Sequence, residues 1–195
     1  MVPRVRAPPL RVNLGLFPTN RTFDIIGTRY LLSTKNRNQR TKNYLIGLIS
    51  DTHSRMRESA LKALRGSDVI LHAGDIGSAD VISALKKIAP VHAIYGNIDI
   101  DPLTRKYSAT EVVEIGGFSF YMLHNLRTLD LKPKAAGFHA VIYGHSHKPE
   151  FYFEEGVLYF NPGSAGPRRF SLPITVGKIR IEGGELFPEI VPLED

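Results

Sequence analysis

The sequence contains no cysteine. Disulfide bonds and thiolate metal sites are therefore excluded, so any metal ion would need nitrogen and oxygen ligands. The absence of cysteine also fits a reducing compartment, and we expect a cytoplasmic protein. No apolar run approaches the roughly 20 residues that a membrane-spanning helix needs, so no membrane partner is expected. With 195 residues, 43% of them hydrophobic, the chain is long enough for one soluble domain with a substantial core.

Acidic residues are scarce at the start of the chain. Residues 1–43 carry nine basic residues and one acidic residue, Asp24, whereas the rest of the sequence is nearly neutral. We expect residues 1–42 to be a basic extension, disordered or presequence-like, and residues 43–195 to be the domain. A misassigned start codon is a further alternative, although Met56 lies beyond the first motif described below. Because the basic residues fall outside the domain, nucleic acid is not favoured as its partner.

Strand and helix patterns alternate in the first half of the domain. Near-continuous apolar residues predict buried strands at 43–50, 68–75 and 91–97. Apolar residues at helical spacing predict helices at 56–65 and 79–89. This alternation predicts parallel strands that are joined by crossover helices.

The second half is rich in strand patterns and has few helical ones. Hairpins are predicted at 110–123, turning at Gly116–Gly117, and at 151–160, turning at Glu155–Gly156. A single strand is predicted at 139–144 and a final strand pair at 174–191. We therefore expect an α/β fold in which two packed β-sheets form a sandwich flanked by helices.

Seven side chains with oxygen or nitrogen donors come directly after predicted strands. They are Asp51, His53, Asp75, Asn97, His124, His145 and His147. The carboxyl ends of strands in an open α/β sheet form the edge where ligands bind. Each residue alone has an ordinary explanation as a turn former, a helix cap or a buried histidine. Seven of them at five strand ends are improbable as independent turn chemistry, so we expect one shared site.

The chemistry of this donor set indicates metal ions. Imidazole and carboxylate without thiolate suit Mn, Fe, Zn, Co or Ni, and the mixture does not choose among them; manganese is our first expectation. Seven donors exceed the four of a tetrahedral site, so we predict two divalent metal ions with one bridging carboxylate. Two cations about 3.5–4 Å apart can hold a bridging hydroxide and clamp a phosphoryl group during in-line attack.

The ordered motifs D-x-H, G-D, G-N, a single H and G-H-x-H resemble those of the calcineurin-like metallophosphoesterases. The segment NPGS at 161–164, followed by Pro167–Arg168, resembles the small single-domain phosphodiesterase branch, and the likeness covers about residues 44–190. It implies a two-sheet sandwich flanked by helices. It also implies that Asp75 bridges two metal ions. The first would have Asp51, His53, Asp75 and His147 as ligands, and the second Asp75, Asn97, His124 and His145.

Two positions depart from the family pattern. Ile98 stands where many members have a histidine that protonates the leaving group, an effect worth about 10²–10⁴-fold in general acid catalysis. Asn125 stands where relatives often have glycine, so the substrate-side loop from Asn125 to Lys134 is not predicted by the resemblance.

Other polar residues have weaker interpretations. We expect His72 to lie in the core or to support a ligand, and His92 and His139 to be structural. Asn161-Pro162-Gly163 predicts a turn that could also support the metal loop by hydrogen bonds. Arg168 either grips a phosphate oxygen or is a solvated surface arginine. Asp99 is expected to cap the turn before Pro102.

The sequence therefore predicts a phosphodiesterase with a small-molecule phosphodiester substrate. The bridging hydroxide would attack phosphorus, while Asn97 and the metal ions stabilise the developing charge. One alternative is a non-catalytic protein-binding scaffold, because residues 144–165 also resemble the retromer's metallophosphoesterase-like subunit. The intact ligand positions favour the enzyme. A third hypothesis is a nuclease guided by the basic extension, and self-association as a homo-oligomer is left open.

Overall fold

The computed structural model describes residues 42–100, 104, 106–169 and 171–194. The expected extension therefore lies outside the described residues except for Lys42, and its character stays a prediction. None of the helices among the described residues is long and apolar enough to cross a membrane.

The first of two five-stranded sheets has the strand order β10-β9-β1-β2-β3. Its strands are β1 (Tyr44–Ile49), β2 (Val69–His72), β3 (Val91–Ala93), β9 (Thr175–Glu182) and β10 (Glu185–Pro192). Helix α1 (Glu58–Leu64) connects β1 to β2, and α2 (Ala79–Leu85) connects β2 to β3. These three strands are parallel, as predicted, whereas β9 and β10 form an antiparallel pair against β1.

The second sheet has the order β4-β5-β6-β8-β7. Its strands are β4 (Thr110–Ile115), β5 (Phe118–Leu123), β6 (Ala140–Ile142), β7 (Glu150–Glu154) and β8 (Val157–Asn161), with a short 3₁₀ helix η1 (Leu126–Thr128) after β5. The predicted hairpins β4–β5 and β7–β8 are antiparallel, while β6 pairs in parallel with both β5 and β8. The two-sheet α/β fold predicted from the sequence is confirmed.

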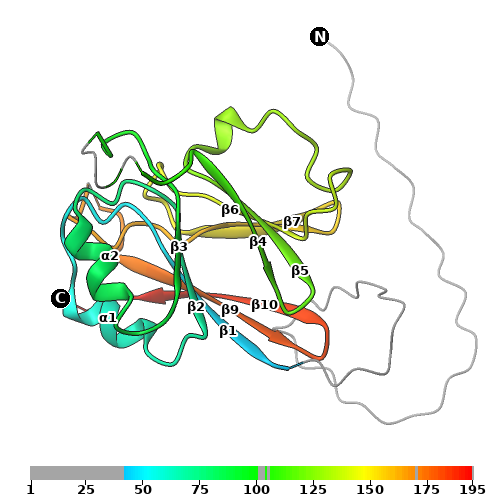
Figure 1. Cartoon of the computed structure of the whole chain (residues 1–195), viewed down its shortest axis with the longest axis horizontal. Helices are drawn as coiled ribbons and strands as arrows, with labels where there is room; N and C mark the ends of the chain where they lie inside the picture. Colours follow the sequence, from blue (N-terminus) through cyan, green and yellow to red (C-terminus); the bar gives the residue numbers. More distant parts are fainter. Residues whose placement is uncertain (1–41, 101–103, 105, 170, 195) are drawn as a thin grey trace, which may run out of the picture.

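Two apolar clusters explain why the first strand is almost continuously hydrophobic. Ile46 and Leu48 belong to the cluster between the two sheets, together with Phe120 and Phe160. Ile49 belongs to the cluster between the first sheet and the helices. Figure 1 shows α1 and α2 beside the first sheet, with the second sheet on its other side. A strand that is covered on both faces needs apolar residues on both faces.

The predicted helices and the third strand are shorter in the structure than the sequence pattern indicates. After Leu85 the chain continues in tight turns, in which Lys87 N–H donates to Ala84 O and Ile88 N–H donates to Leu85 O. Such three-residue hydrogen bonds commonly tighten the last turn of a helix. Strand β3 ends at Ala93, since the backbone then turns through Gly96 toward the candidate site.

Candidate metal centre

The loops after β1 and β2 are joined by backbone hydrogen bonds. Asp51 N–H donates to Gly74 O, and His53 N–H donates to Asp75 O, both at 3.0 Å. The side chain of Asp51 is fully buried, and its Oδ2 accepts hydrogen bonds from Ser50 Oγ at 2.7 Å and from His145 N at 3.1 Å. The first and last histidine motifs are therefore anchored to the same carboxylate.

Asp51, His53 and His147 form the first group of possible metal ligands, with one ligand atom from each within 4.8 Å of the others. His147 Nε2 lies 3.2 Å from Asp51 Oδ1 and 3.3 Å from His53 Nε2. These atoms come from the ends of β1 and β6. The structure thus brings together three residues that the sequence analysis assigned to one metal ion.

Asp51, Asp75 and His124 form a second group by the same criterion. His124 Nδ1 lies 2.7 Å from Ala73 O. Its Nε2 lies 3.3 Å from Asp75 Oδ1. The ring of His145 lies beside that of His124, with centroids 5.2 Å apart.

Asp51 is the residue that the two groups share, and Asp75 belongs to the second group. The Asp75 carboxylate also faces a histidine of the first group: its Oδ2 is 3.7 Å from His53 Nε2, and its Oδ1 faces His124 and accepts the Ile98 N–H at 3.1 Å. Both carboxylates are therefore near histidines of the two groups.

Three buried side-chain atoms among the described residues have no hydrogen-bond partner: Asp51 Oδ1, His124 Nε2 and His147 Nδ1. All three belong to candidate ligands. A buried polar atom without a partner costs about 1–3 kcal/mol, so such atoms need an explanation. Divalent cations would satisfy Asp51 Oδ1 and a deprotonated His124 Nε2, whereas His147 Nδ1 points away from the metal position and is not explained in this way. The first two atoms fit a metal site.

The charges of the site also suit cations. Burial would raise the pKa of Asp75, but the neighbouring His124 imidazole and the Ile98 N–H outweigh this and hold the pKa at about 2. For His124, burial lowers the pKa, and the interactions with Asp75 and Ala73 O raise it by more, so that the net shift is upward. Burial lowers the pKa of His53, although Asp75 opposes the shift. An ionised Asp75 and a neutral His53 are the forms that bind metal.

The backbone is unusual at the candidate ligands. Seven described non-glycine residues have positive φ, and five of them are Asp51, His53, Asp75, His145 and His147. Side chains disfavour this conformation, and residues held in it cluster at functional sites. The hydrogen bonds between the loops hold it in place here.

Glycines at positions 74, 96 and 144 allow the loops to approach one another. A Cβ atom on Gly96 would overlap Asp75 Oδ1 and lie 2.9 Å from His124 Nε2. A Cβ atom on Gly144 would overlap Ser50 Oγ and lie 2.7 Å from Asp51 Oδ2. Neither position has space for a side chain.

Asp99 has a larger role than the sequence indicated. It is buried, and its carboxylate accepts hydrogen bonds from Gly96 N at 2.7 Å, Gly77 N at 2.8 Å and Ile76 N at 3.1 Å. It therefore joins the loop that carries Asp75 to the loop that carries Asn97. The prediction of a local cap before Pro102 missed this long-range role, and Pro102 itself lies outside the described residues.

His72 supports the site from behind. It is fully buried and its pKa falls to about 4 because of burial. Gly74 N–H donates to its Nδ1 at 3.3 Å, so its Nε2 carries the proton and donates to Thr52 Oγ1 at 3.0 Å. Thr52 in turn donates to Ile76 O at 2.9 Å. The expectation that His72 lies in the core is confirmed.

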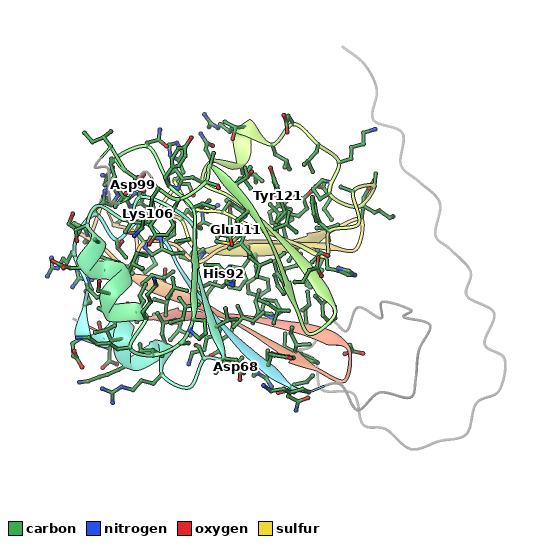
Figure 2. All side chains as sticks on the ribbon, in the orientation of Figure 1. Asp68, His92, Asp99, Lys106, Glu111 and Tyr121 are labelled. Atoms are coloured by element: carbon green, nitrogen blue, oxygen red, sulfur yellow. The ribbon has the colours of Figure 1, made fainter. Side chains whose placement is uncertain are left out.

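The turn at Asn161 supports the last histidine motif, as the sequence analysis expected. Asn161 Nδ2 donates to Gly144 O at 2.8 Å and to Ser146 Oγ at 2.9 Å. The other two histidines make structural contacts: His92 Nδ1 lies 2.7 Å from Glu111 Oε1 (Figure 2), and His139 Nδ1 accepts the Ser119 N–H at 3.0 Å.

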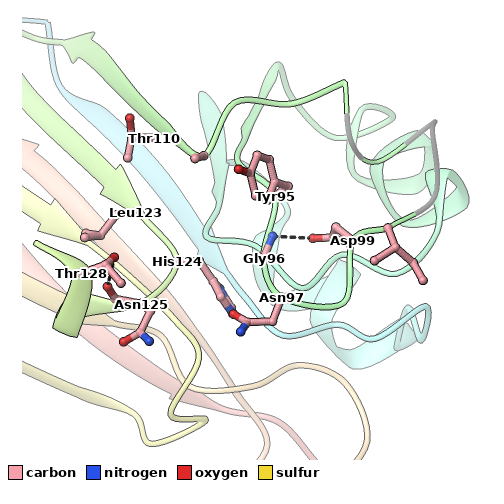
Figure 3. Close-up of a pocket in the computed structure, with 11 residues that line it drawn as sticks. Tyr95, Gly96, Asn97, Asp99, Thr110, Leu123, His124, Asn125 and Thr128 are labelled. Atoms are coloured by element: carbon pink, nitrogen blue, oxygen red, sulfur yellow. Dashed lines mark hydrogen bonds between the residues drawn. The ribbon is translucent and has the colours of Figure 1, made fainter.

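Asn97, Arg168 and Arg169 are exposed residues that could meet a substrate. Asn97 is exposed, and its side chain lies beside His124 in an open pocket (Figure 3). Arg168 is exposed as well. The sequence analysis did not consider its neighbour Arg169, whose positive charge acts on His53 and lowers the pKa of that histidine further. Arg169 is therefore a second candidate for contact with a phosphate oxygen.

Comparisons with known proteins identified a matching family and several relatives. Residues 44–184 match the calcineurin-like phosphoesterase superfamily domain. A protein of Methanothermobacter thermautotrophicus described as a probable metallophosphoesterase is 34% identical over 166 residues, which cover 75% of this chain and 91% of that protein. A phosphodiesterase of Methanocaldococcus jannaschii is 29% identical over 164 residues, which cover 75% of this chain and 98% of that protein.

Solved structures with the same fold include an archaeal phosphodiesterase, with a TM-score of 0.63 and 25% identity over 75% of this chain and 99% of that chain. Vacuolar protein sorting 29 of Cryptosporidium parvum has a TM-score of 0.62 and 18% identity, covering 78% and 99%. The Vps29 of Entamoeba histolytica, solved in complex with Zn²⁺, has a TM-score of 0.57 and 21% identity, covering 77% and 99%. The two Vps29 structures establish likeness of fold.

Proposed function

The chain belongs to the calcineurin-like phosphoesterase superfamily, and from this premise we propose that it is a phosphodiesterase that uses two divalent metal ions and a hydroxide shared between them. The observation that carries the proposal is the position of Asp75. Its two carboxylate oxygens face imidazoles that belong to different ligand groups, at 3.3 Å and 3.7 Å.

The proposed ligand division is the one that the family resemblance implies, and the proximity of Asp51, His53 and His147 and of Asp75 and His124 supports it. One metal ion would be held by Asp51, His53, Asp75 and His147, and the other by Asp75, Asn97, His124 and His145. Nitrogen and oxygen ligands suit manganese, iron, zinc, cobalt or nickel, with manganese as the first expectation. When bound, the pair of ions supplies a hydroxide nucleophile at neutral pH and neutralises charge on the phosphoryl oxygens.

The protein's own groups would orient the ester. Asn97 is exposed at the mouth of the site, and its amide can donate a hydrogen bond to a phosphoryl oxygen as negative charge develops there. As the new P–O bond forms, the P–O bond to the leaving alcohol breaks. Ile98 has no proton to give to the departing oxygen. Esters with good leaving groups should therefore react fastest.

The substrate class follows from the relatives. The Methanocaldococcus jannaschii relative is a phosphodiesterase, and so is the archaeal protein of known structure. We assign a small-molecule phosphodiester to this chain by likeness to them, in the cytoplasm that the cysteine-free sequence favours. A protein-binding scaffold would not need the buried, unpartnered ligand atoms of this site. A nuclease would need the basic segment, so deleting residues 1–42 should then weaken nucleic-acid binding and its salt dependence.

Replacing Asp75 tests the proposal. Asp75→Asn should keep the fold, as measured by far-UV circular dichroism, and lose nearly all Mn²⁺-dependent hydrolysis of bis(p-nitrophenyl) phosphate. The matched control is Asp80→Asn, which removes an exposed carboxylate from the first turn of α2 and should leave turnover unchanged. Undiminished turnover in Asp75→Asn would refute the proposed mechanism. Absence of hydrolysis in the unaltered, metal-loaded protein would favour the scaffold.

A further inference from the structure

An open cavity of about 370 Å³ lies against the second metal position. His124 and Asn97 both line it, so a phosphoryl group held at the candidate metal centre would lie at its edge. We call it the Tyr95 pocket. Its volume is within the range of about 300–1,000 Å³ that small-molecule sites occupy.

The walls of the Tyr95 pocket are largely uncharged. Figure 3 shows Tyr95 on one side of the pocket and Thr110, Leu123 and Thr128 on the other. Tyr95 is 38% exposed, so part of its ring is available for stacking. Polar atoms come from hydroxyl and amide side chains, which can hydrogen-bond an uncharged ligand.

The wall of the Tyr95 pocket includes one carboxylate, and that carboxylate already accepts hydrogen bonds from the backbone. Apart from His124, Asp99 is the only charged or basic side chain among the described residues that line the Tyr95 pocket. Both of its oxygens accept backbone hydrogen bonds, from Ile76, Gly77 and Gly96. The described walls therefore offer no cation to a second anionic group of a substrate.

A second cavity, which lies on the other side of Asn125, has charged walls. It also measures about 370 Å³, and Asn125 lines both cavities. Its walls include Arg127, His145 and Glu150, so a ligand there meets charged side chains. The two ester groups of a phosphodiester would consequently meet two unlike surfaces.

From this contrast we infer that the Tyr95 pocket binds one ester group of the substrate, and that this group is uncharged and carries a ring. The inference rests on the proposed phosphodiesterase function. It adds that the enzyme selects among diesters by the charge of the group beside Asn97 and His124. The described side chains of the pocket wall would offer an anionic ester group no cation to offset the loss of its hydration.

Symmetrical diesters test the inference, because either ester group can then enter the pocket. The probes are bis(p-nitrophenyl) phosphate, which has two uncharged rings, and bis(4-carboxyphenyl) phosphate, which has two anionic rings. The measured quantity is the ratio of kcat/KM for the uncharged to the anionic diester. We expect the ratio to fall by about tenfold or more in Thr110→Lys, which places a cation on the pocket wall.

Val112→Lys is the matched control. Val112 is exposed on the same strand as Thr110, two residues farther along, and does not line the pocket. The ratio of kcat/KM for the two diesters should be the same in Val112→Lys as in the unaltered protein. Ala109→Lys, on the same wall as Thr110, repeats the test if Thr110→Lys does not fold.

Two results would overturn the inference. One is an unchanged ratio in folded pocket variants, and the other is an equal change in Val112→Lys. In both cases the unaltered protein would still hydrolyse the diesters, so the proposed function would stand. If the metal-loaded, unaltered protein hydrolyses neither diester, the proposed function fails and the inference fails with it.

Discussion

Single atoms decide whether the candidate centre can hold metal ions. Asp75 stays ionised because His124 holds its pKa at about 2 despite burial. His124 in turn is positioned by its contact with Ala73 O at 2.7 Å, which places its Nε2 3.3 Å from Asp75 Oδ1. Space at this contact is set by Gly96, because any side chain there would overlap the Asp75 carboxylate. One backbone position therefore controls the second metal position.

We expect Gly96→Ala to abolish binding of the second metal ion. The added methyl group would overlap Asp75 Oδ1 and lie 2.9 Å from His124 Nε2, so one of the two ligands must move. Mn²⁺ titration by isothermal calorimetry would measure the loss as a lower stoichiometry. An unaltered stoichiometry and affinity would contradict the close approach of Gly96 to these two ligands.

Gly117→Ala is the contrasting variant. Gly117 also lies in a turn, with φ of +83°, but a Cβ atom there would meet nothing within 4 Å. Left-handed backbone strain should lower its free energy of unfolding by about 1–2 kcal/mol. Metal stoichiometry should remain that of the unaltered protein, which separates strain from obstruction of the site.

At the scale of elements, the site depends on loops that are tied together from outside the ligand set. Asp99 joins the β2 loop to the β3 loop through three backbone N–H groups. Asn161, at the end of β8, holds the loop after β6 through Gly144 O and Ser146 Oγ. These contacts allow five candidate ligands to keep positive φ.

Asp99→Asn should weaken both the fold and the site. The amide has one acceptor oxygen, so its NH₂ group must face at least one of the three buried N–H groups. We expect the free energy of unfolding to fall by about 1–3 kcal/mol, as measured by urea denaturation without metal. Mn²⁺ affinity should fall about 10–100-fold, because the loops that carry the ligands are less constrained.

Asp130→Asn is the control for that prediction, since Asp130 is exposed. Its stability and metal affinity should match those of the unaltered protein. If Asp99→Asn behaves in the same way as this control, the two loops do not depend on the Asp99 carboxylate.

Local sequence signals predicted most elements, and long-range contacts account for what they missed. Paired glycines at 116–117 placed the β4–β5 hairpin correctly, since they favour a tight turn. The role of Asp99 was not predictable, because its partners Ile76 and Gly77 lie more than twenty positions earlier in the sequence. The Tyr95 pocket likewise forms from segments that no local pattern connects. Arg169 was missed for the same reason.

At the scale of the whole molecule, the two sheets bring distant strand ends to one place. Candidate ligands from Asp51 to His147 follow strands of both sheets, so the centre exists only when the sheets pack together. Metal binding should therefore raise the free energy of unfolding of the two sheets together. Domain boundaries, the basic extension and self-association stay predictions.

The most direct measurement is anomalous diffraction from a crystal of the unaltered protein soaked in Mn²⁺. We expect two anomalous peaks about 3.5–4 Å apart, with the Asp75 carboxylate touching both and the imidazoles of His124 and His147 on opposite sides. A single peak, or peaks that Asp75 does not bridge, would contradict the proposed two-metal centre.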